Sequence, residues 1–324
     1  MHRLRPDRLL AALMVALLLP LALACGGSSS GSGNTLGTSA PRRDKLVIAV
    51  QPTSTAEQLA ADAKQLEQFL SQRLNRPVEL VFPTSYAGVI EALRFGHAHA
   101  AFMSAWPLAL AQKYAGAEIA LAEVREVVIG EQKTEAPYYY SYWIVRKDSP
   151  YQKLEELRGK RVALPSQLST SGYVAPVARL VELGLLPQEG READPKRFFG
   201  DVIYAGGYAQ SWEALKAGQV DATVIAGDVA ESLYREVLAN SRVIEQQGPV
   251  PSHGVAFARQ LDAPSRTELL AALMELGQPE NRPLMRKFIS GIFVRFQPTT
   301  AEEHLGALNR YLQLTQSQFV ERLR

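Results

Sequence analysis

The chain contains a single cysteine, Cys25, among its 324 residues, so it cannot form an internal disulfide bond. It also lacks a strong charge of either sign, with 35 basic and 33 acidic residues. The first 24 residues hold three arginines and one aspartate, and the remaining chain carries equal numbers of basic and acidic residues. A neutral body has no general attraction for a phosphate backbone, which excludes nucleic acid as an expected partner.

Motifs of several enzyme classes are also missing. The sequence has neither the His-Glu-x-x-His motif of zinc proteases nor the Gly-x-x-x-x-Gly-Lys-Ser/Thr loop that holds nucleotide phosphates. His97 and His99 lie on one face of an expected strand, but the sequence places no suitable third metal ligand near them. Solvated histidines explain this pair better. We therefore expect no catalytic residue, no metal and no cofactor.

A long apolar run occurs only near the amino terminus. Three arginines precede an almost continuous apolar run over residues 9–23, and small residues stand directly before Cys25. The run is rather short for a membrane-spanning helix. A basic region, an apolar region and a small-residue cleavage point together predict a secretory signal peptide over residues 1–24.

Strand and helix patterns alternate through the rest of the chain. Short apolar runs typical of buried strands are followed by segments with a helical spacing of apolar residues. The expected strands are 45–50, 78–82, 98–103, 118–128, 138–145, 161–164, 201–204, 222–226, 242–245 and 254–259, and the chain from residue 264 on is expected to be helical. This order predicts an α/β fold of mostly parallel sheets flanked by helices. The number of strands fits two lobes, with the chain crossing between them at 138–145 and 254–259.

Three consecutive hydroxyl residues, Ser169, Thr170 and Ser171, stand between the expected strand at 161–164 and an expected helix that begins near residue 173. The first backbone N–H groups of a helix have no partner within it, and the helix dipole places partial positive charge there. Hydroxyl groups add further hydrogen-bond donors. This corner therefore favours an anion, although an ordinary helix N-cap explains the residues equally well.

Other expected strands also end in loops with hydroxyl or aromatic residues. Tyr86 follows Thr84-Ser85, Trp106 follows Ser104, and Tyr208 follows a pair of glycines. Ligands of open parallel sheets bind beyond the carboxyl ends of the strands, where these loops lie. Two lobes with such helix starts facing one cleft would form a clamp for a small anion.

Four segments, in this order, resemble the substrate-binding lipoproteins of phosphonate, phosphate and phosphite ABC transporters, a branch of the two-lobed type II periplasmic binding proteins. The segments are TSYAGVIEAL at 84–93, YYSYWIVRKDS at 139–149, LRGKRVALPSQLSTSG at 157–172 and ALKAGQVDA at 214–222. The resemblance covers about residues 45–314. It implies a two-lobed fold with two hinge crossings, a small anionic ligand, and a function in transport without bond making or breaking.

The resemblance also implies roles for individual residues. Ser169, Thr170 and Ser171 match the turn that holds the phosphonate oxygens in that family. Tyr86 and Tyr139 match the tyrosines that close the pocket.

Three positions depart from the family pattern. Tyr208 stands where the family commonly has histidine, and we expect it to donate a neutral hydrogen bond. Asp228 and His253 stand where aminophosphonate binders carry two acids, so a cationic amine on the ligand is less expected, and His253 is a candidate partner for anionic oxygens. Asp228 as a plain N-cap of residues 229–238 is an equal alternative. Trp106 is expected at the pocket rim.

Cys25 resembles the cysteine of a bacterial lipobox, although Ala22 and Leu23 depart from the usual pattern and ordinary cleavage beside an incidental cysteine is the alternative. The Gly- and Ser-rich residues 26–40 are typical of a flexible tether. We therefore expect an extracytoplasmic monomer that contacts the bacterial membrane only through lipidated Cys25. Its expected partners are the permease and ATPase subunits of an ABC transporter.

These expectations divide the chain into a signal peptide at 1–24, an anchor and linker at 25–44, one lobe from 45–139 with 254–324, and a second lobe at 140–253.

Two other functions stay open. One is a secreted hydrolase that uses Ser169 or Ser171 with His253, and the other is a subunit that reports ligand occupancy to a membrane signalling partner. The sequence does not identify which phosphorus oxyanion is bound. His304, on the amphipathic terminal helix, is expected at the surface.

Overall fold

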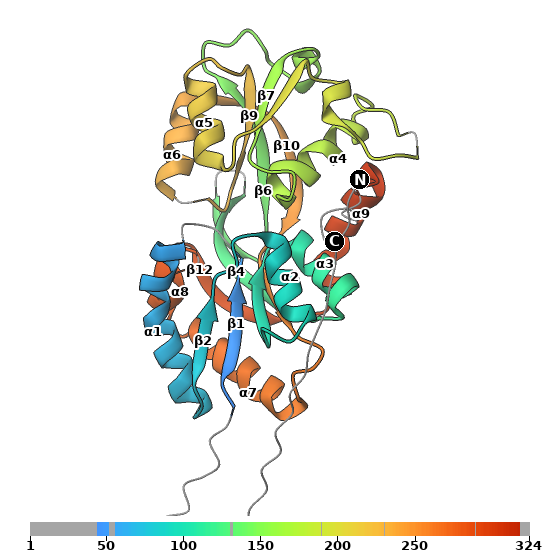
Figure 1. Ribbon diagram of the computed structural model, residues 1–324. Helices are drawn as coiled ribbons and strands as arrows, with labels where there is room; N and C mark the ends of the chain where they lie inside the picture. Colours follow the sequence, from blue (N-terminus) through green and yellow to red (C-terminus); the bar gives the residue numbers. More distant parts are fainter. Residues whose placement is uncertain are drawn as a thin grey trace, which may run out of the picture. The chain divides into compact units, whose positions relative to one another are not determined.

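The computed structural model describes residues 44–51, 56–129, 132–188, 190–229, 231–288 and 290–317, which belong to one unit, residues 42–324 (Figure 1). Cys25, the expected signal peptide and the linker through residue 43 lie outside these ranges. Within the ranges, no helix combines the length and the apolar character needed to cross a bilayer.

The first sheet has seven strands in the order β12-β4-β11-β3-β1-β2, with β5 paired to β4. The strands are β1 (Leu46–Val50), β2 (Val78–Val81), β3 (Ala100–Met103), β4 (Glu118–Ile129), β5 (Gln132–Ala136), β11 (Gly254–Phe257) and β12 (Phe293–Pro298). β1 pairs in parallel with β2 and β3, whereas β11, β4, β12 and β5 join by antiparallel pairing.

Helices cover both faces of the first sheet. They are α1 (Ala56–Leu74), α2 (Tyr86–Arg94), α3 (Ala105–Ala115), α7 (Ala263–Met274) and α8 (Arg282–Phe288). Successive strand residues point to opposite faces, so Ile48 packs in a core with Leu66 of α1 and Leu269 of α7, while Ala49 packs in a core with Ile90 of α2. The first sheet and these helices are called the first lobe below.

The second sheet has five strands in the order β10-β6-β9-β7-β8. They are β6 (Tyr138–Arg146), β7 (Arg161–Leu164), β8 (Asp201–Tyr204), β9 (Ala222–Ala226) and β10 (Ser241–Pro251). Its helices are α4 (Ala175–Glu182), α5 (Tyr208–Lys216) and α6 (Glu231–Asn240), with α5 and α6 on one side of the sheet and α4 on the other (Figure 1). This sheet with its helices is the second lobe.

The chain passes between the lobes twice, from β5 to β6 at Pro137 and from β10 to β11 at Ser252 and His253. The expected two-lobed α/β fold is therefore confirmed. The sheets are mixed, because the parallel strands β2-β1-β3 and β8-β7-β9 are extended by antiparallel strands. Among these are the four strands that flank the crossings, β5, β6, β10 and β11.

The expectation that the chain is helical from residue 264 on was wrong at β12. Its sequence FVRFQP is short, and Phe293 and Phe296 are buried while Arg295 is exposed. β12 forms because it pairs with β4, which lies about 170 residues earlier in the chain. A pairing between segments so far apart leaves no signal in the local sequence of β12.

The last described helix, α9 (Ala301–Thr315), contacts both lobes, packing on α3 and on α4 (Figure 1). His304 of α9 is buried, with 7% of its surface exposed, so its expected surface location was wrong. Its Nε2 lies 3.0 Å from the backbone oxygen of Ser252 in the second crossing. Burial lowers the pKa of His304 to about 4, which keeps the imidazole neutral and its Nε2–H available as a donor.

The buried neutral histidine predicts a pH dependence of stability. Between pH 6.5 and about 4 the unfolded chain protonates His304 while the folded chain does not, so the free energy of unfolding falls as the pH falls through this window. The variant His304→Gln keeps a donor for Ser252 without titrating. Between pH 7 and pH 4.5 it should lose about 2–3 kcal/mol less stability than the wild type in urea unfolding. His97→Gln changes an exposed histidine and should behave as the wild type; equal pH profiles for all three proteins would contradict the role of His304.

Candidate functional site

The three consecutive hydroxyl residues lie at a helix start, as predicted. β7 ends at Leu164, a π-helical turn spans Thr170–Val174, and α4 continues from it. Ser169 is the N-cap of this turn, and its Oγ accepts a hydrogen bond of 2.9 Å from the backbone N–H of Gly172. The capping role is thus observed for Ser169, whose own O–H remains a donor.

Ser171 is held by two tyrosines. Its Oγ accepts a hydrogen bond of 2.9 Å from the hydroxyl of Tyr139 on β6 and lies 2.7 Å from the hydroxyl of Tyr208, the first residue of α5. Burial raises the pKa of both tyrosines, so both hydroxyls stay neutral. Ser169, Thr170, Ser171, Tyr139 and Tyr208 are called the hydroxyl cluster below.

The first lobe reaches this cluster through two helix starts. The backbone N–H of Trp106, in the first turn of α3, donates a 3.2 Å hydrogen bond to Oγ1 of Thr170. Tyr86 begins α2 and lies near enough to Tyr208 to raise its pKa. The side chain of Gln51, at the end of β1, hydrogen bonds to Tyr86 and to Ser104.

A buried ion cluster forms a second contact between the lobes. Arg125 on β4 lies between two carboxylates, with Nη2 2.5 Å from Glu123 and Nη1 2.5 Å from Asp228. The side chains of Arg125 and Glu123 are 2% exposed and that of Asp228 is 10% exposed. Burial alone would lower the pKa of Arg125, but Glu123 and Asp228 raise it above its usual value. Glu123, Arg125 and Asp228 are called the ion cluster.

Asp228 lies in the turn after β9, and α6 begins only at Glu231. The alternative that Asp228 is the N-cap of a helix over 229–238 is therefore wrong, because its carboxylate is bound to Arg125 instead.

His253 lies in the second crossing, and its backbone oxygen accepts a hydrogen bond from the N–H of Glu123. Burial, with Arg125 and His304 nearby, lowers the pKa of His253 well below its usual value. The imidazole is therefore neutral, and its expected role as a charged partner of an anion is not supported by its surroundings.

Each of the nine predicted site residues belongs to one of the two clusters or lies against one of its members. Trp106 contacts Thr170, Tyr86 lies near Tyr208, and His253 contacts Glu123 through its backbone. Sequence reasoning missed Gln51, Glu123 and Arg125. Glu123 and Arg125 are two apart on a strand and so share one face within a buried run. That pattern was visible in the sequence, whereas the pairing of Arg125 with Asp228 was not.

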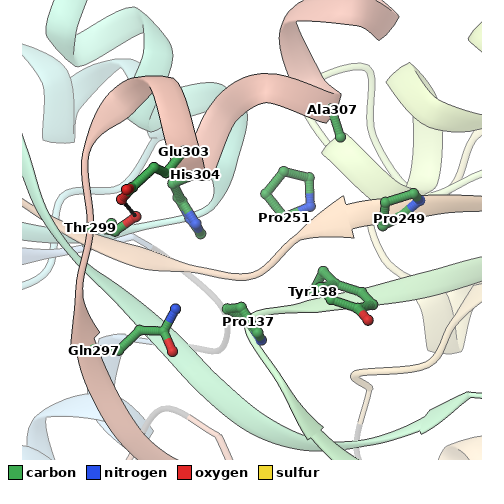
Figure 2. Close-up of a pocket in the computed structure, with 9 residues that line it drawn as sticks. All are labelled: Pro137, Tyr138, Pro249, Pro251, Gln297, Thr299, Glu303, His304 and Ala307. Carbon is green, nitrogen blue, oxygen red and sulfur yellow. Dashed lines mark hydrogen bonds between the residues drawn. The ribbon is translucent and has the colours of Figure 1, made fainter.

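A separate pocket of about 380 Å³ contains none of the nine residues (Figure 2). It lies at the crossings, where Pro137, Tyr138 and Pro251 face His304 and Ala307 of α9. Tyr138 and Tyr139 are neighbours on β6 and therefore point to opposite faces. The pocket lies on the face of β6 opposite to the hydroxyl cluster.

A family model described as "ABC transporter, phosphonate, periplasmic substrate-binding protein" matches residues 48–304. The phosphate-import protein PhnD of Mycolicibacterium smegmatis is 32% identical over 213 residues, which cover 65% of this chain and 62% of that relative. The match therefore spans less than two thirds of the relative's length.

Solved structures share the fold. A binding protein component of an ABC phosphonate transporter from Pseudomonas aeruginosa aligns with a TM-score of 0.66 and 20% identity over 83% of this chain and 86% of that one. PhnD1 from Prochlorococcus marinus, in complex with methylphosphonate, aligns with a TM-score of 0.63 and 14% identity over 83% and 97%. At these identities the likeness is one of fold.

The close packing around Gly172 predicts a sensitive position. A Cβ atom at Gly172 would lie 2.8 Å from Oγ of Ser169 and 2.8 Å from Cγ of Pro165, closer than real contacts allow. Gly172→Ala should displace the N-cap and lower the free energy of unfolding by about 1–3 kcal/mol in urea unfolding, because the added methyl group overpacks the turn. Gly306→Ala is the control, since nothing lies within 4 Å of the added Cβ in α9; it should stabilise the helix by about 1 kcal/mol. Unchanged stability of Gly172→Ala would contradict the close packing of this turn.

Proposed function

The chain belongs to the periplasmic substrate-binding proteins of phosphonate ABC transporters, and on that premise we propose that it captures a small phosphorus oxyanion and delivers it to an ABC permease and its ATPase. The observation that carries the proposal is the hydroxyl cluster. Neutral hydroxyls of three elements meet there at the start of a helix, where the N–H groups and the dipole favour an anion.

The ligand is proposed to bind with its oxygens toward Ser169, Thr170 and Ser171. In the second lobe, Tyr139 donates its O–H to Ser171 and Tyr208 lies beside the same hydroxyl, so both tyrosines orient Ser171 toward the ligand, while Tyr86 and Trp106 approach from the first lobe. A ligand that contacts both lobes selects the arrangement in which they meet. The contacts of Thr170 with Trp106 and of Asp228 with Arg125 support such a closed state.

The sequence placed the first lobe boundary after residue 139, but all of β6 belongs to the second sheet. The lobes are therefore proposed to comprise residues 45–137 with 254–324 and residues 138–253, a division that the crossings at Pro137 and at Ser252 and His253 support. The comparisons give no support to the hydrolase or the signalling subunit. In the structure, the hydroxyl of Ser171 is bonded to Tyr139 and Tyr208.

How the protein is attached to the membrane is also a proposal. The lipobox-like segment ending in Cys25 and the tether that follows it support a monomer held to the bacterial membrane by lipid on Cys25.

Ligand binding should depend on single hydroxyl groups. Thr170→Val and Ser171→Ala each remove a donor to a charge that is shielded from water, which should cost about 1.5–3 kcal/mol of binding free energy. Isothermal calorimetry with phosphate, phosphite and methylphosphonate measures the loss. Thr267→Val removes an exposed hydroxyl on α7 and is the matched control. Full affinity in both site variants would disprove the assigned binding site.

Anchoring should depend on the cysteine. Cys25→Ser removes the proposed acylated thiol, so the full chain expressed in a bacterium should move from the membrane fraction to the soluble extracytoplasmic fraction. Immunoblots of both fractions test this, and a variant that stays with the membrane would rule out the lipid anchor.

A further inference from the structure

The end of the first lobe that lies away from the hydroxyl cluster has an exposed aromatic side chain. α2 and α3 both begin beside the cluster, so the two helices end on the far side of the lobe. Phe95, the C-cap residue of α2, is 64% exposed, more than any other large apolar side chain of the described residues. A single exposed ring is common on protein surfaces, so its meaning depends on its neighbours.

The turn after β11 joins the ends of α2 and α3 into one surface. Nε2 of Gln260 donates a 3.0 Å hydrogen bond to the backbone oxygen of Leu93, near the end of α2. The neighbouring Arg259 lies against Gly116, the C-cap residue of α3, where an added Cβ would be 3.4 Å from Cδ of the arginine. Phe95 therefore has Arg259 and the last turn of α3 as neighbours from distant parts of the chain.

This surface carries unpaired positive charge. Arg94, Lys113 and Arg259 are exposed, and none of them forms an ion pair with a described residue. Cζ of Arg94 lies 5.4 Å from the ring centroid of Phe95, and Nζ of Lys113 lies 5.2 Å from that of Tyr114. The following residues are called the basic aromatic patch below: Arg94, Phe95, His97, Lys113, Tyr114 and Arg259.

The nearby carboxylates do not pair with these cations. Glu118 is paired with Arg266, and Asp262 is the N-cap of α7, where its carboxylate accepts a hydrogen bond from a backbone N–H. Glu91 lies about one turn before Arg94 on α2 and forms no ion pair with it. The three cations therefore face outward around the rings.

The chain enters the first lobe at the same end, at the start of β1 (Figure 1). Asp44 is the first described residue, and its backbone oxygen accepts a 2.9 Å hydrogen bond from Nε of Arg76. The backbone N–H of His99, two residues after His97, donates a 2.8 Å hydrogen bond to the backbone oxygen of Val47 in β1. Residues 26–43 therefore join the body beside the basic aromatic patch.

The proposed lipid on Cys25 would keep this end of the body near the bilayer. Residues 26–43 separate the cysteine from Asp44 and are mostly Gly and Ser. A chain of this length and composition has a root-mean-square end-to-end distance of about 21–25 Å. Two more arginines, Arg42 and Arg43, directly precede Asp44 in the sequence. Basic residues at an anionic lipid surface each strengthen its binding by about fivefold.

The patch thus combines cations, an exposed ring and proximity to the anchor. We propose that, within the anchored binding function put forward above, the basic aromatic patch docks the first lobe on anionic phospholipid headgroups. The ring of Phe95 lies among the headgroups, and Arg94, Lys113 and Arg259 pair with their phosphates. The hydroxyl cluster lies at the opposite ends of α2 and α3, so docking leaves the ligand site away from the lipid surface.

Vesicle sedimentation tests the patch without the lipid anchor. The secreted form of Cys25→Ser should sediment with phosphatidylglycerol vesicles at low ionic strength and not with phosphatidylcholine vesicles, and salt should weaken the binding. Adding Arg94→Gln and Arg259→Gln should lower the partition coefficient about 25-fold. Adding Lys147→Gln and Arg158→Gln instead changes two exposed cations of the second lobe and is the matched control, which should bind as Cys25→Ser does.

A fluorescent reporter tests the orientation of the full chain in the membrane. Phe95→Trp should show blue-shifted emission and quenching when the protein is reconstituted with brominated phosphatidylglycerol. Leu238→Trp places the same reporter at a side chain of the second lobe that is 37% exposed, and it should not be quenched. The three native tryptophans are buried, and the wild type supplies their signal for subtraction.

Three results would overturn the proposal. They are equal binding to both kinds of vesicle, unchanged binding after Arg94→Gln and Arg259→Gln, and equal quenching of the two reporters. A wild-type dimer that these two substitutions dissociate in sedimentation velocity would also overturn it, because the patch would then bind a second copy of the chain.

Calorimetry with phosphite separates this proposal from the proposed function. The patch variants should keep the wild-type affinity for phosphite, which also shows that they are folded. If the wild type binds none of phosphate, phosphite and methylphosphonate, the proposed function fails, while the vesicle results still decide the role of the patch.

Discussion

The ion pair between Arg125 and Asp228 joins two sheets that the chain itself connects only through two short crossings. A buried pair of this kind is stable only in good geometry, because removing one partner leaves an uncompensated charge in a shielded place. The position of β4 relative to the turn after β9 is therefore narrowly set. The hydroxyl cluster lies beside this pair and depends on the same lobe arrangement, since Thr170 is bonded to Trp106 of the other lobe.

Much of the fold followed from local patterns. The short apolar strands and the helix starts at Tyr86 and Tyr208 were visible as changes of hydrophobic period or as turn residues. The strands expected to be the crossings, 138–145 and 254–259, lie within the two sheets, and the chain crosses just before each of them. What the sequence did not show were the features fixed by distant pairing. β12 and β5 form because each pairs with β4, one along each of its two edges. Neither segment has a strong alternation of apolar and polar residues of its own.

The site was predictable to a similar limit. Ser171, Tyr139 and Tyr208 could be placed together because loops after parallel strands meet at one edge, and because the motif order resembled a known family. In the structure, the hydroxyl of Ser171 is hydrogen bonded to the hydroxyls of both tyrosines. Arg125 was missed because a charged residue inside an apolar strand has no assigned partner until the opposite lobe is in place. His304 was misjudged for the same reason, since the crossing that buries it is about 50 residues away in the chain.

α9 has a consequence for how the two halves can separate. His304 ties it to the second crossing, and the hydroxyl of Tyr311 ties it to β10 by donating to the backbone oxygen of Pro249. Arg310 of α9 pairs with Glu182 of α4. Together with the crossings it forms a spine along the face that holds the pocket of Figure 2. A separation of the lobes that keeps these contacts therefore opens the protein on the side away from α9 and the crossings.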